Sequence, residues 1–419
     1  MLVGVSRPGD AIVLAVLNSS GSPSMRRLRP GRILAVMLAL LLVAAALIQL
    51  TGHGYFWTAL RYTYLQGQTT AHIDDARNFV QAPIAGARAE SWPMAAIQAS
   101  LSQETQSFLA QHKSAAFLVA RRGELLHESY FAPYSADSRT NVFSMAKTVT
   151  TLLYGAAVQD GIVPALNAKA ATWLDRYAAD PLGRDATLLH FAAMSSGHDW
   201  LENYYLPFNP TTELYFGGDA AGTVLRMGFA QTPGQAFYYS SASTQLLGIA
   251  LSRALARHEP GLDLSAYLSR RLWQPLGMEG GASWSLDRDR RAGGHELAYC
   301  CIHASARQMA RLGQLLLQGG VWQGQPLIAA DFIQQMTQPN GLVDHYGLGL
   351  WMDPAHEPSF YFMQGHLGQY VIVVPSEQLV IVRLGQYRVK TFAQHPKVPD
   401  EVYRYVREGV RMARSVAVR

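Results

Sequence analysis

The two ends of this 419-residue chain carry strand patterns, whereas the middle is mainly helical, and this distribution constrains the fold most. Apolar, β-branched segments between turn residues predict strands at 115–120, 124–131, 346–352, 370–374 and 379–384. Strands from both ends predict one antiparallel sheet flanked by helices, in an α+β (α/β sandwich) architecture. The helical part, about 150–290, is then an inserted subdomain beside the sheet. A last helix is predicted over 400–413, after Pro399.

An apolar run near the N-terminus predicts a membrane segment. Residues 33–48 are apolar without interruption, and Gln49 and Leu50 extend the run toward the ~20 residues that span a bilayer. Four arginines precede it, which favours a cytoplasmic N-terminus and export of the rest. We therefore expect a leader over 1–32, whose true start is Met25, and an uncleaved signal anchor over 33–50. A cleaved signal peptide is the alternative.

The segment after the anchor mixes aromatic residues, polar residues and Gly/Pro breaks. We expect residues 51–92 to form a membrane-proximal stalk and residues 93–419 to form the main domain. This arrangement predicts a bacterial inner-membrane protein with its main domain in the periplasm, or a periplasmic or secreted one if the signal is cleaved. The oligomeric state is not predicted.

Composition excludes several functional classes. The chain is 49% hydrophobic, enough for a large core, and its net charge is only +5. Outside the leader no basic stripe with interleaved aromatics occurs, so we expect no nucleic-acid binding. The two cysteines, Cys300 and Cys301, are adjacent, and we expect them to be packed thiols rather than a disulfide. His295-Glu296 lacks the second histidine of a zinc motif, since position 299 is tyrosine, and we expect no metal or cofactor.

Ser144-Met145-Ala146-Lys147 is a candidate nucleophile and base. Positions i and i+3 share a helix face, so the Lys147 amine can reach the Ser144 hydroxyl. A serine attacks poorly unless a base takes its proton, and a desolvated lysine can be that base. The apolar residues that follow predict a buried helix, whose N-terminus favours developing negative charge. Alone, the spacing also fits an ordinary helix start capped by serine.

Two further clusters supply polar groups. Tyr239-Ser240-Ser241 lies on a turn before an apolar helix, and a nearby ammonium such as Lys147 would lower the pKa of the phenol. His366-Leu367-Gly368-Gln369 opens a strand, where backbone N–H groups can bind an oxyanion. Taken singly, the first also fits an aromatic turn on the core and the second an ordinary turn.

In this order, the three clusters resemble the class C β-lactamase-like family of serine hydrolases. That family carries Ser-x-x-Lys, then Tyr-x-Asn or Tyr-x-Ser, then Lys-Thr-Gly or His-x-Gly. Residues 188–200 and 304–320 also resemble family segments, and the resemblance covers roughly residues 93–390. It implies the β-lactamase/penicillin-binding-protein fold.

The resemblance also implies the roles of the residues. Ser144 is the acylated nucleophile, Lys147 takes or shares its proton, and Tyr239 relays protons. The oxyanion rests on the amides of Ser144 and Gln369. Gly368, His366, Ser241 and Asp199 are expected at the substrate. Glu202 and Tyr204, in the segment of Asp199, either line the pocket or are surface residues.

Two departures narrow the expected reaction. Ser241 stands where β-lactamases have asparagine, and His366-Leu367 replaces Lys-Thr, whose lysine helps to bind a substrate carboxylate. The pattern looks like the branch with esterases and 6-aminohexanoate-dimer hydrolase, so we expect cleavage of a small ester or linear amide. The alternatives are a D-amino-acid peptidase, transpeptidase or β-lactamase of the same fold, or a catalytically silent protein that binds cell-wall fragments.

Overall fold

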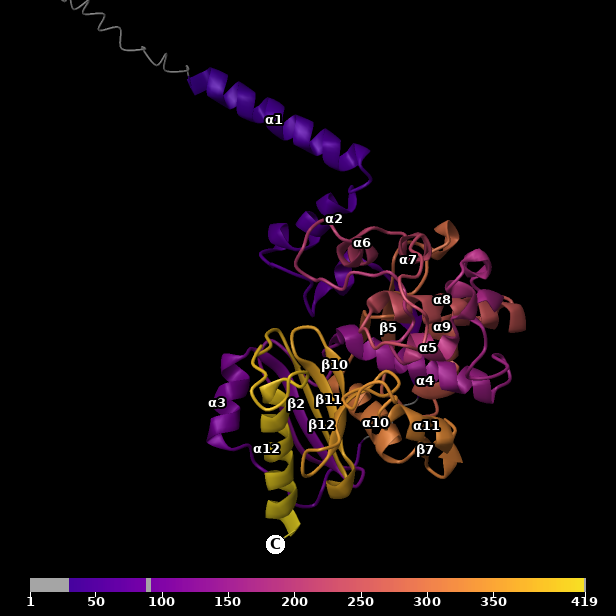
Figure 1. Cartoon of the computed structure of the whole chain (residues 1–419). Coiled ribbons are helices and arrows are strands. Elements are labelled where there is room, and N and C mark those ends of the chain that lie inside the picture. Colours follow the sequence, from indigo (N-terminus) through magenta and orange to yellow (C-terminus); the bar gives the residue numbers. More distant parts are fainter. Residues whose placement is uncertain (1–29, 88–91, 418–419) are drawn as a thin grey trace, which may run out of the picture. The chain divides into compact units, whose positions relative to one another are not determined.

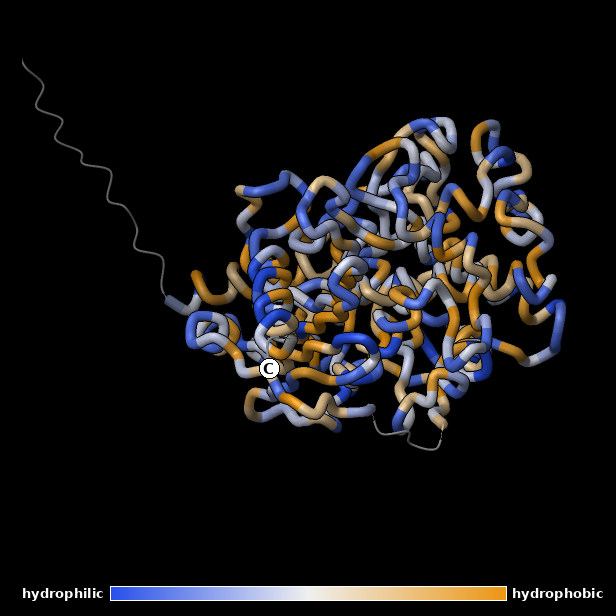
Figure 2. The backbone as a smooth tube through the Cα atoms, turned by 90° about the horizontal axis from the view of Figure 1, so that it is seen from below, coloured by the Kyte–Doolittle hydropathy of each residue, from blue (hydrophilic) through white to orange (hydrophobic). Residues whose placement is uncertain are grey.

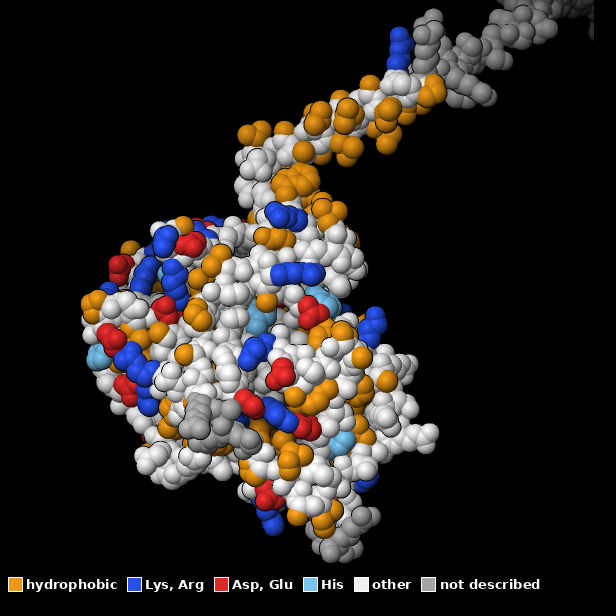
Figure 3. All heavy atoms as spheres, turned by 180° about the vertical axis from the view of Figure 1, so that it is seen from behind, with side chains coloured by type: hydrophobic (Ala, Val, Ile, Leu, Met, Phe, Trp, Pro, Cys, Tyr) orange, Lys and Arg blue, Asp and Glu red, His pale blue; other side chains and the backbone are white. Residues whose placement is uncertain are grey.

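The structure is a computed structural model that describes residues 30–87 and 92–417 (Figure 1). It divides into two units, residues 1–51 and 52–419. In the first unit, helix α1 (Pro30–Leu50) is long and apolar enough to cross a membrane. Apolar side chains cover its length (Figure 3), and none of its residues is buried. The expected leader and its start at Met25 lie largely outside the described residues.

The second unit is built on a six-stranded antiparallel sheet of order β3-β2-β12-β11-β10-β9. The strands are β2 (Ser114–Arg121), β3 (Glu124–Tyr130), β9 (Trp351–Asp353), β10 (Phe360–Gly365), β11 (Gln369–Val374) and β12 (Leu379–Gly385). β2 pairs with β12, with Phe117 opposite Arg383. The predicted joining of both chain ends in one sheet, and with it the α+β fold, is confirmed.

Both faces of this sheet are covered, because alternate strand residues enter different cores. Phe117 and Val119 of β2 belong to a core with α3 (Gln103–Gln111) and α12 (Asp400–Ala417). Leu118 and Ala120 belong to a larger core that includes α4 (Ala146–Gln159) and α10 (Ala306–Leu317). The helices flank the sheet on its two sides (Figure 1), and hydrophobic segments gather inside the unit (Figure 2). The sequence missed β10, and the strand predicted over 346–352 is confined to Trp351–Asp353.

The middle of the chain forms short helices and a second sheet. The helices are α5 (Leu188–Ala192), α6 (Pro210–Phe216), α7 (Ala220–Leu225), α8 (Ser241–His258), α9 (Leu264–Leu268) and, further on, α11 (Ala330–Met336). The second sheet has the order β1-β5-β6-β4, with β1 (Val80–Ile84), β4 (Thr140–Asn141), β5 (Ala282–Leu286) and β6 (Ile302–Ala304). A small hairpin joins β7 (Val321–Trp322) to β8 (Gln325–Pro326). Among these helices α8 is nearly all buried, and it begins at the site described below.

The segment expected as a stalk belongs instead to the second unit from Gly52 onward. Helix α2 (Tyr55–Tyr62) packs against α6, and β1 pairs with β5, placing Val80 opposite Leu286. Ile73, between them, is fully buried in the larger core. The stalk prediction is therefore wrong for these residues, because a short helix and a single strand give too little periodicity to reveal burial.

We expect Ile73→Ala to lower the free energy of unfolding by about 2–5 kcal/mol, because it removes a buried side chain and leaves a cavity. Leu65→Ala is the matched control in the same segment, since Leu65 is 74% exposed, and should change stability by less than about 0.5 kcal/mol. Urea unfolding of the purified chain measures both. Equal, small effects would show that the segment is a stalk after all.

Candidate active site

Ser144 lies on a tight turn immediately before helix α4. The turn is a 3-10 helix over Phe143–Met145, and Phe143 has a positive φ of 48°. The Phe143 amide donates to the Asn141 side chain at 2.8 Å. Lys147 is the second residue of α4, and its Nζ donates to Ser144 Oγ at 2.9 Å, so the predicted contact is present. Ser144 thus sits at the positive end of a buried helix with an amine on its hydroxyl.

Lys147 is 2% exposed, and its three donors have three acceptors. Besides Ser144 Oγ, its Nζ donates to Ser241 Oγ and to the Tyr299 carbonyl, each at 3.1 Å. Burial lowers the pKa of Lys147 to about 8, and the charge of Glu202 partly opposes this shift. With a pKa of about 8, roughly a tenth of the molecules hold a neutral Lys147 at pH 7 and about half at pH 8, and a neutral amine has a lone pair for the Ser144 proton.

Tyr239 also reaches Ser144, but its pKa shifts opposite to our expectation. Burial raises the pKa of the phenol above its ordinary value, and the hydrogen bond with Ser144 opposes the shift only in part. Lys147 Nζ lies 5.1 Å from the centre of the Tyr239 ring. The predicted lowering fails because desolvation outweighs the amine, which is itself less charged when buried. Tyr239 is consequently a protonated phenol and a proton donor.

Glu202, which the sequence left as either a pocket or a surface residue, fixes Ser241. Glu202 accepts from the Ser241 amide at 2.8 Å and from the Ser241 hydroxyl at 2.6 Å. It also accepts from Trp200 Nε1 at 2.8 Å. Because the Ser241 proton points to Glu202, an oxygen lone pair is left for Lys147.

Asp199, which we expected at the substrate, is exposed, and it is not among the residues lining the cavity beside Ser144. Its amide donates to the Gly228 carbonyl at 2.9 Å, and its expected place at the substrate stays a prediction. The two acids stand three residues apart, and only the fold shows which of them turns inward.

The turn between β10 and β11 carries His366, Leu367, Gly368 and Gln369. His366 Nε2 lies 3.2 Å from Thr70 Oγ1, and its ring packs edge-on against Phe143. Burial, together with the positive charges of Arg388 and Lys390, lowers the pKa of His366 to about 4, so the imidazole is neutral. His366 therefore lacks the charge of the lysine that it replaces, and its partner Thr70 comes from the segment expected as a stalk.

Hydrogen bonds hold this turn rigidly. Arg383 donates to the carbonyls of Leu367 at 3.0 Å and Gly368 at 2.8 Å. Gly368 has φ of 84°, and a Cβ there would meet Arg383 Nη1 at 2.5 Å. The Gln369 side chain donates to the carbonyls of His366 and Gly385 at 2.9 and 2.6 Å.

Gly365 joins the turn to the nucleophile. A Cβ on Gly365 would lie 2.3 Å from the Val142 carbonyl, so this end of β10 abuts the backbone just before Ser144. Gly365 is paired with Gln369 in the β10–β11 ladder. The Gln369 backbone therefore lies at the same end of the sheet as Ser144.

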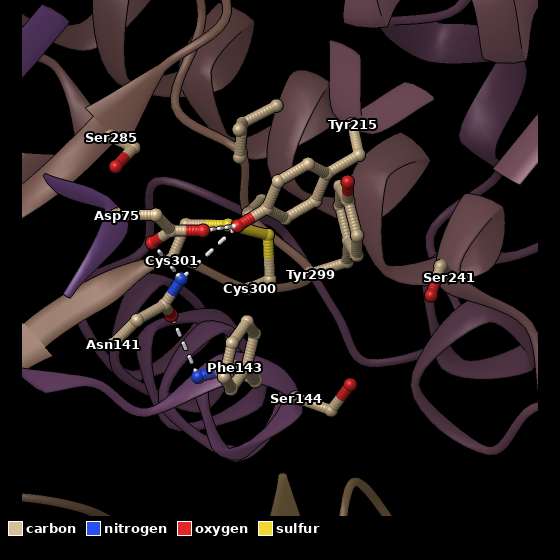
Figure 4. The surroundings of a disulfide bond; sticks show 12 residues. Asp75, Asn141, Phe143, Ser144, Tyr215, Ser241, Ser285, Tyr299, Cys300 and Cys301 are labelled. Carbon is tan, nitrogen blue, oxygen red and sulfur yellow. Dashed lines mark hydrogen bonds between the residues drawn. A yellow bond between two sulfur atoms is a disulfide. The ribbon is translucent and has the colours of Figure 1, made fainter. Parts of the chain in front are cut away.

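Cys300 and Cys301 form a disulfide, contrary to our expectation (Figure 4). The adjacent residues meet where Cys301 has a positive φ of 69°. The bridge directly follows Tyr299, whose carbonyl accepts from Lys147. It therefore stiffens the backbone that holds the amine.

Asp75 supports the nucleophile turn from the other side (Figure 4). Asn141 Nδ2 donates to Asp75 Oδ1 at 3.0 Å, and the Tyr215 hydroxyl donates to the other carboxylate oxygen. Burial raises the pKa of Asp75 to about 6. Asn141 in turn accepts from the Phe143 amide, so a buried carboxylate orients the amide group beside Ser144.

A cavity of about 530 Å³ opens beside Ser144. Its walls come from α2, the loop over 204–207 and α6, and from Phe143, Cys300 and His366. No cluster of three or more His, Cys, Asp or Glu suited to a metal ion occurs in the described parts of the chain. The available chemistry is thus that of a serine, a lysine and a tyrosine beside a pocket of ordinary ligand size.

Comparison with known proteins places these residues in a wider group. Residues 101–397 match the family described as Beta-lactamase. The 6-aminohexanoate-dimer hydrolase of Paenarthrobacter ureafaciens is 26% identical over 231 residues, which are 53% of this chain and 56% of that protein. The chain thus spans about half the length of this curated relative.

Solved structures share the fold at low identity. A Bacillus anthracis protein provisionally assigned as a 6-aminohexanoate-dimer hydrolase has a TM-score of 0.67 at 20% identity, over 86% of this chain and 94% of the other. A family VIII carboxylesterase has a TM-score of 0.56 at 17% identity, over 76% and 99% of the two chains.

We expect Glu202→Gln to shift the reactivity of Ser144 to lower pH. Labelling by a serine-reactive fluorophosphonate requires neutral Lys147, so its rate rises with pH around 8. Removing the negative charge that raises the pKa of Lys147 moves this midpoint downward. The limiting rate should also fall about 10- to 100-fold, because a charged acceptor of two Ser241 bonds is lost.

Asp199→Asn is the control, because it neutralises an exposed acid three residues away. Its pH profile should match that of the unchanged chain. An unaltered or higher midpoint in Glu202→Gln would contradict the assigned role of Glu202.

Proposed function

This chain belongs to the β-lactamase family of serine hydrolases, and on that premise we propose that it cleaves a small ester or linear amide through an acyl-enzyme on Ser144. One observation carries the proposal: buried Lys147 donates to Ser144 Oγ at 2.9 Å, and burial lowers its pKa to about 8. A nucleophile and a base in hydrogen-bond contact are what acyl transfer requires.

Acylation begins when neutral Lys147 takes the Ser144 proton and Oγ attacks the scissile carbonyl. The resulting oxyanion accepts from the backbone amides of Ser144 and Gln369, each typically worth about 2.7–4 kcal/mol. Tyr239, protonated because burial raises its pKa, gives a proton to the leaving oxygen or nitrogen. Proton transfer from Lys147 to Tyr239 then restores both groups. Water attacks the acyl-enzyme by the reverse of these steps and releases the acid.

The turn at His366 favours this reaction over those of β-lactamases and D-amino-acid peptidases. A neutral imidazole engaged with Thr70 stands where those enzymes place a lysine that binds a substrate carboxylate. A catalytically silent binding protein would not require a lysine of lowered pKa in contact with a serine hydroxyl, so this alternative does not explain the site. The similarity to a 6-aminohexanoate-dimer hydrolase and to a family VIII carboxylesterase is consistent with amide or ester cleavage by this chain.

We further propose that α1 anchors an exported enzyme in the bacterial inner membrane, with the catalytic unit in the periplasm. The apolar side chains of α1 are exposed, and a lipid bilayer would remove them from water. The arginines before α1 favour a cytoplasmic N-terminus. The small-molecule substrate then reaches the enzyme outside the cytoplasm.

We expect a fluorophosphonate probe to label the chain and Ser144→Ala to abolish labelling. The substitution should lower p-nitrophenyl acetate turnover on the order of 10⁴-fold or more, because it removes the nucleophile. Nitrocefin should be turned over poorly by the unchanged chain. Labelling that survives in Ser144→Ala would refute the assignment, whereas stable acylation by penicillin with little ester turnover would identify a peptidase.

We expect the full chain to stay in the membrane pellet after carbonate extraction, since about 20 apolar residues make a stable span. A chain starting at Gly52 should be released. A mature protein found in the soluble fraction, beginning after residue 50, would identify a cleaved signal peptide instead.

A further inference from the structure

We propose that the cavity beside Ser144 receives an uncharged, apolar part of the substrate, a hydrocarbon chain or ring attached to the scissile ester or amide. This inference rests on the proposed hydrolytic function and specifies the substrate class of the same site. The cavity adjoins the nucleophile itself, because Ser144 and Phe143 form part of its wall.

One wall of the cavity is a single face of helix α2. Phe56, Ala59 and Leu60 line it, and Thr63 follows directly after the helix. Their spacing is that of positions i, i+3, i+4 and i+7, which share one side of a helix. Binding of a hydrocarbon group against this apolar helix face would remove apolar surface from water, which is favourable.

A second part of the wall is apolar and aromatic. It consists of Leu206 and Pro207 from the loop before α6, together with Tyr215 and Phe216 at the end of α6. The polar side chains in the lining are threonines, tyrosines, Ser144 and His366. At about 530 Å³ the space is far larger than a catalytic water or a formyl group needs.

No lining residue that the structure describes is Asp, Glu, Lys or Arg. His366 is the one titratable imidazole there, and its lowered pKa keeps it neutral. A charged substrate group would therefore be desolvated in this cavity without a partner, which costs several kcal/mol. The charged ends of amino-acid oligomers do not fit such walls.

Positive charge lies close to the turn but outside this lining. Arg388 and Lys390 act on His366, and Lys390 Nζ bonds the Tyr205 hydroxyl and lies 4.3 Å from the centre of its ring. If the substrate carried a carboxylate, these residues would be its partners. The experiment below includes that outcome.

The first test measures kcat/KM for two ester series. One lengthens the acyl chain of p-nitrophenyl esters from acetate to decanoate, and the other lengthens the alcohol of acetate esters. Because either side of the carbonyl can enter the cavity, we expect one series to rise about three- to fourfold per methylene until the cavity is full. Two flat or falling series would overturn the proposal, as would a carboxylate-ended acyl ester preferred over its uncharged counterpart of equal length.

The ester series also separates this proposal from the function on which it rests. If no ester is cleaved and no probe reacts, the hydrolytic function fails. If acetate esters are cleaved by the unchanged chain but not by Ser144→Ala, that function stands, and the chain-length dependence alone decides the substrate class.

The second test fills the cavity. Ala59→Trp places an indole on the lining face of α2, whereas Thr58→Trp adds the same group one residue away, outside the lining. We expect Ala59→Trp to lose most of the gain from long chains, so that the ratio of kcat/KM for the best long ester to kcat/KM for the acetate ester falls at least tenfold. Thr58→Trp should keep the gain. A long-chain gain preserved in Ala59→Trp would contradict the assignment.

The apolar group can come from a soluble ester or from a membrane lipid. Exposed apolar residues near the cavity, among them Leu65, Tyr205 and Leu206, suit either source. The decanoate ester is therefore offered as monomers in solution and, separately, within phosphatidylglycerol vesicles. Faster cleavage in vesicles identifies a lipid source, and faster cleavage of monomers a soluble one; both support an apolar substrate, and cleavage in neither overturns it.

Discussion

The buried amine of Lys147 is the interaction on which the rest of the site depends. An ammonium that has lost water needs a partner for every proton, and these partners come from three separate parts of the chain: the turn before α4, the start of α8, and Tyr299. Burial has two consequences at once. It lowers the pKa of Lys147 to about 8, so that the neutral amine is accessible near physiological pH. It also connects helix α4 to the helical subdomain through the hydrogen bonds of one nitrogen atom. The burial that lowers the pKa of Lys147 thus comes with hydrogen bonds that hold α4 against the start of α8.

The partners of Lys147 are themselves held by charges one step further out. Glu202 fixes the Ser241 hydroxyl, and Asp75 fixes Asn141, which orients the amide beside Ser144. Both carboxylates lie in segments without regular strands of their own. Such segments are therefore structural parts of the site, although their sequences resemble connecting loops. The neutral His366 follows the same pattern, because Thr70 occupies its Nε2.

Much of the site could be predicted because its chemistry has a linear signature. Ser144 and Lys147 are one helical turn apart, and the order of Tyr239 and His366 behind them identified the family, which the comparisons confirm. The pairing of strands from both chain ends also followed from apolar runs. The predictions that failed concern residues whose roles depend on burial in the folded chain. Nothing in the local pattern distinguishes Glu202 from Asp199, shows that Ile73 enters the core, or indicates that Cys300 and Cys301 bond. The sign of the Tyr239 shift likewise follows from desolvation, which spacing does not encode.

The pairing of β2 with β12 affects when the sheet can form during synthesis and folding of the chain. β2 ends at Arg121, whereas its partner begins only at Leu379, so the central pair of the sheet joins residues separated by most of the chain. Gln369 and the turn that holds it also lie in this late part. A nascent chain therefore carries Ser144 and Lys147 long before it has Gln369 and the turn that holds it. Contacts of such high sequence separation form slowly. The central pairing of the sheet can therefore form only after Leu379 has been synthesised, long after Ser144 and Lys147.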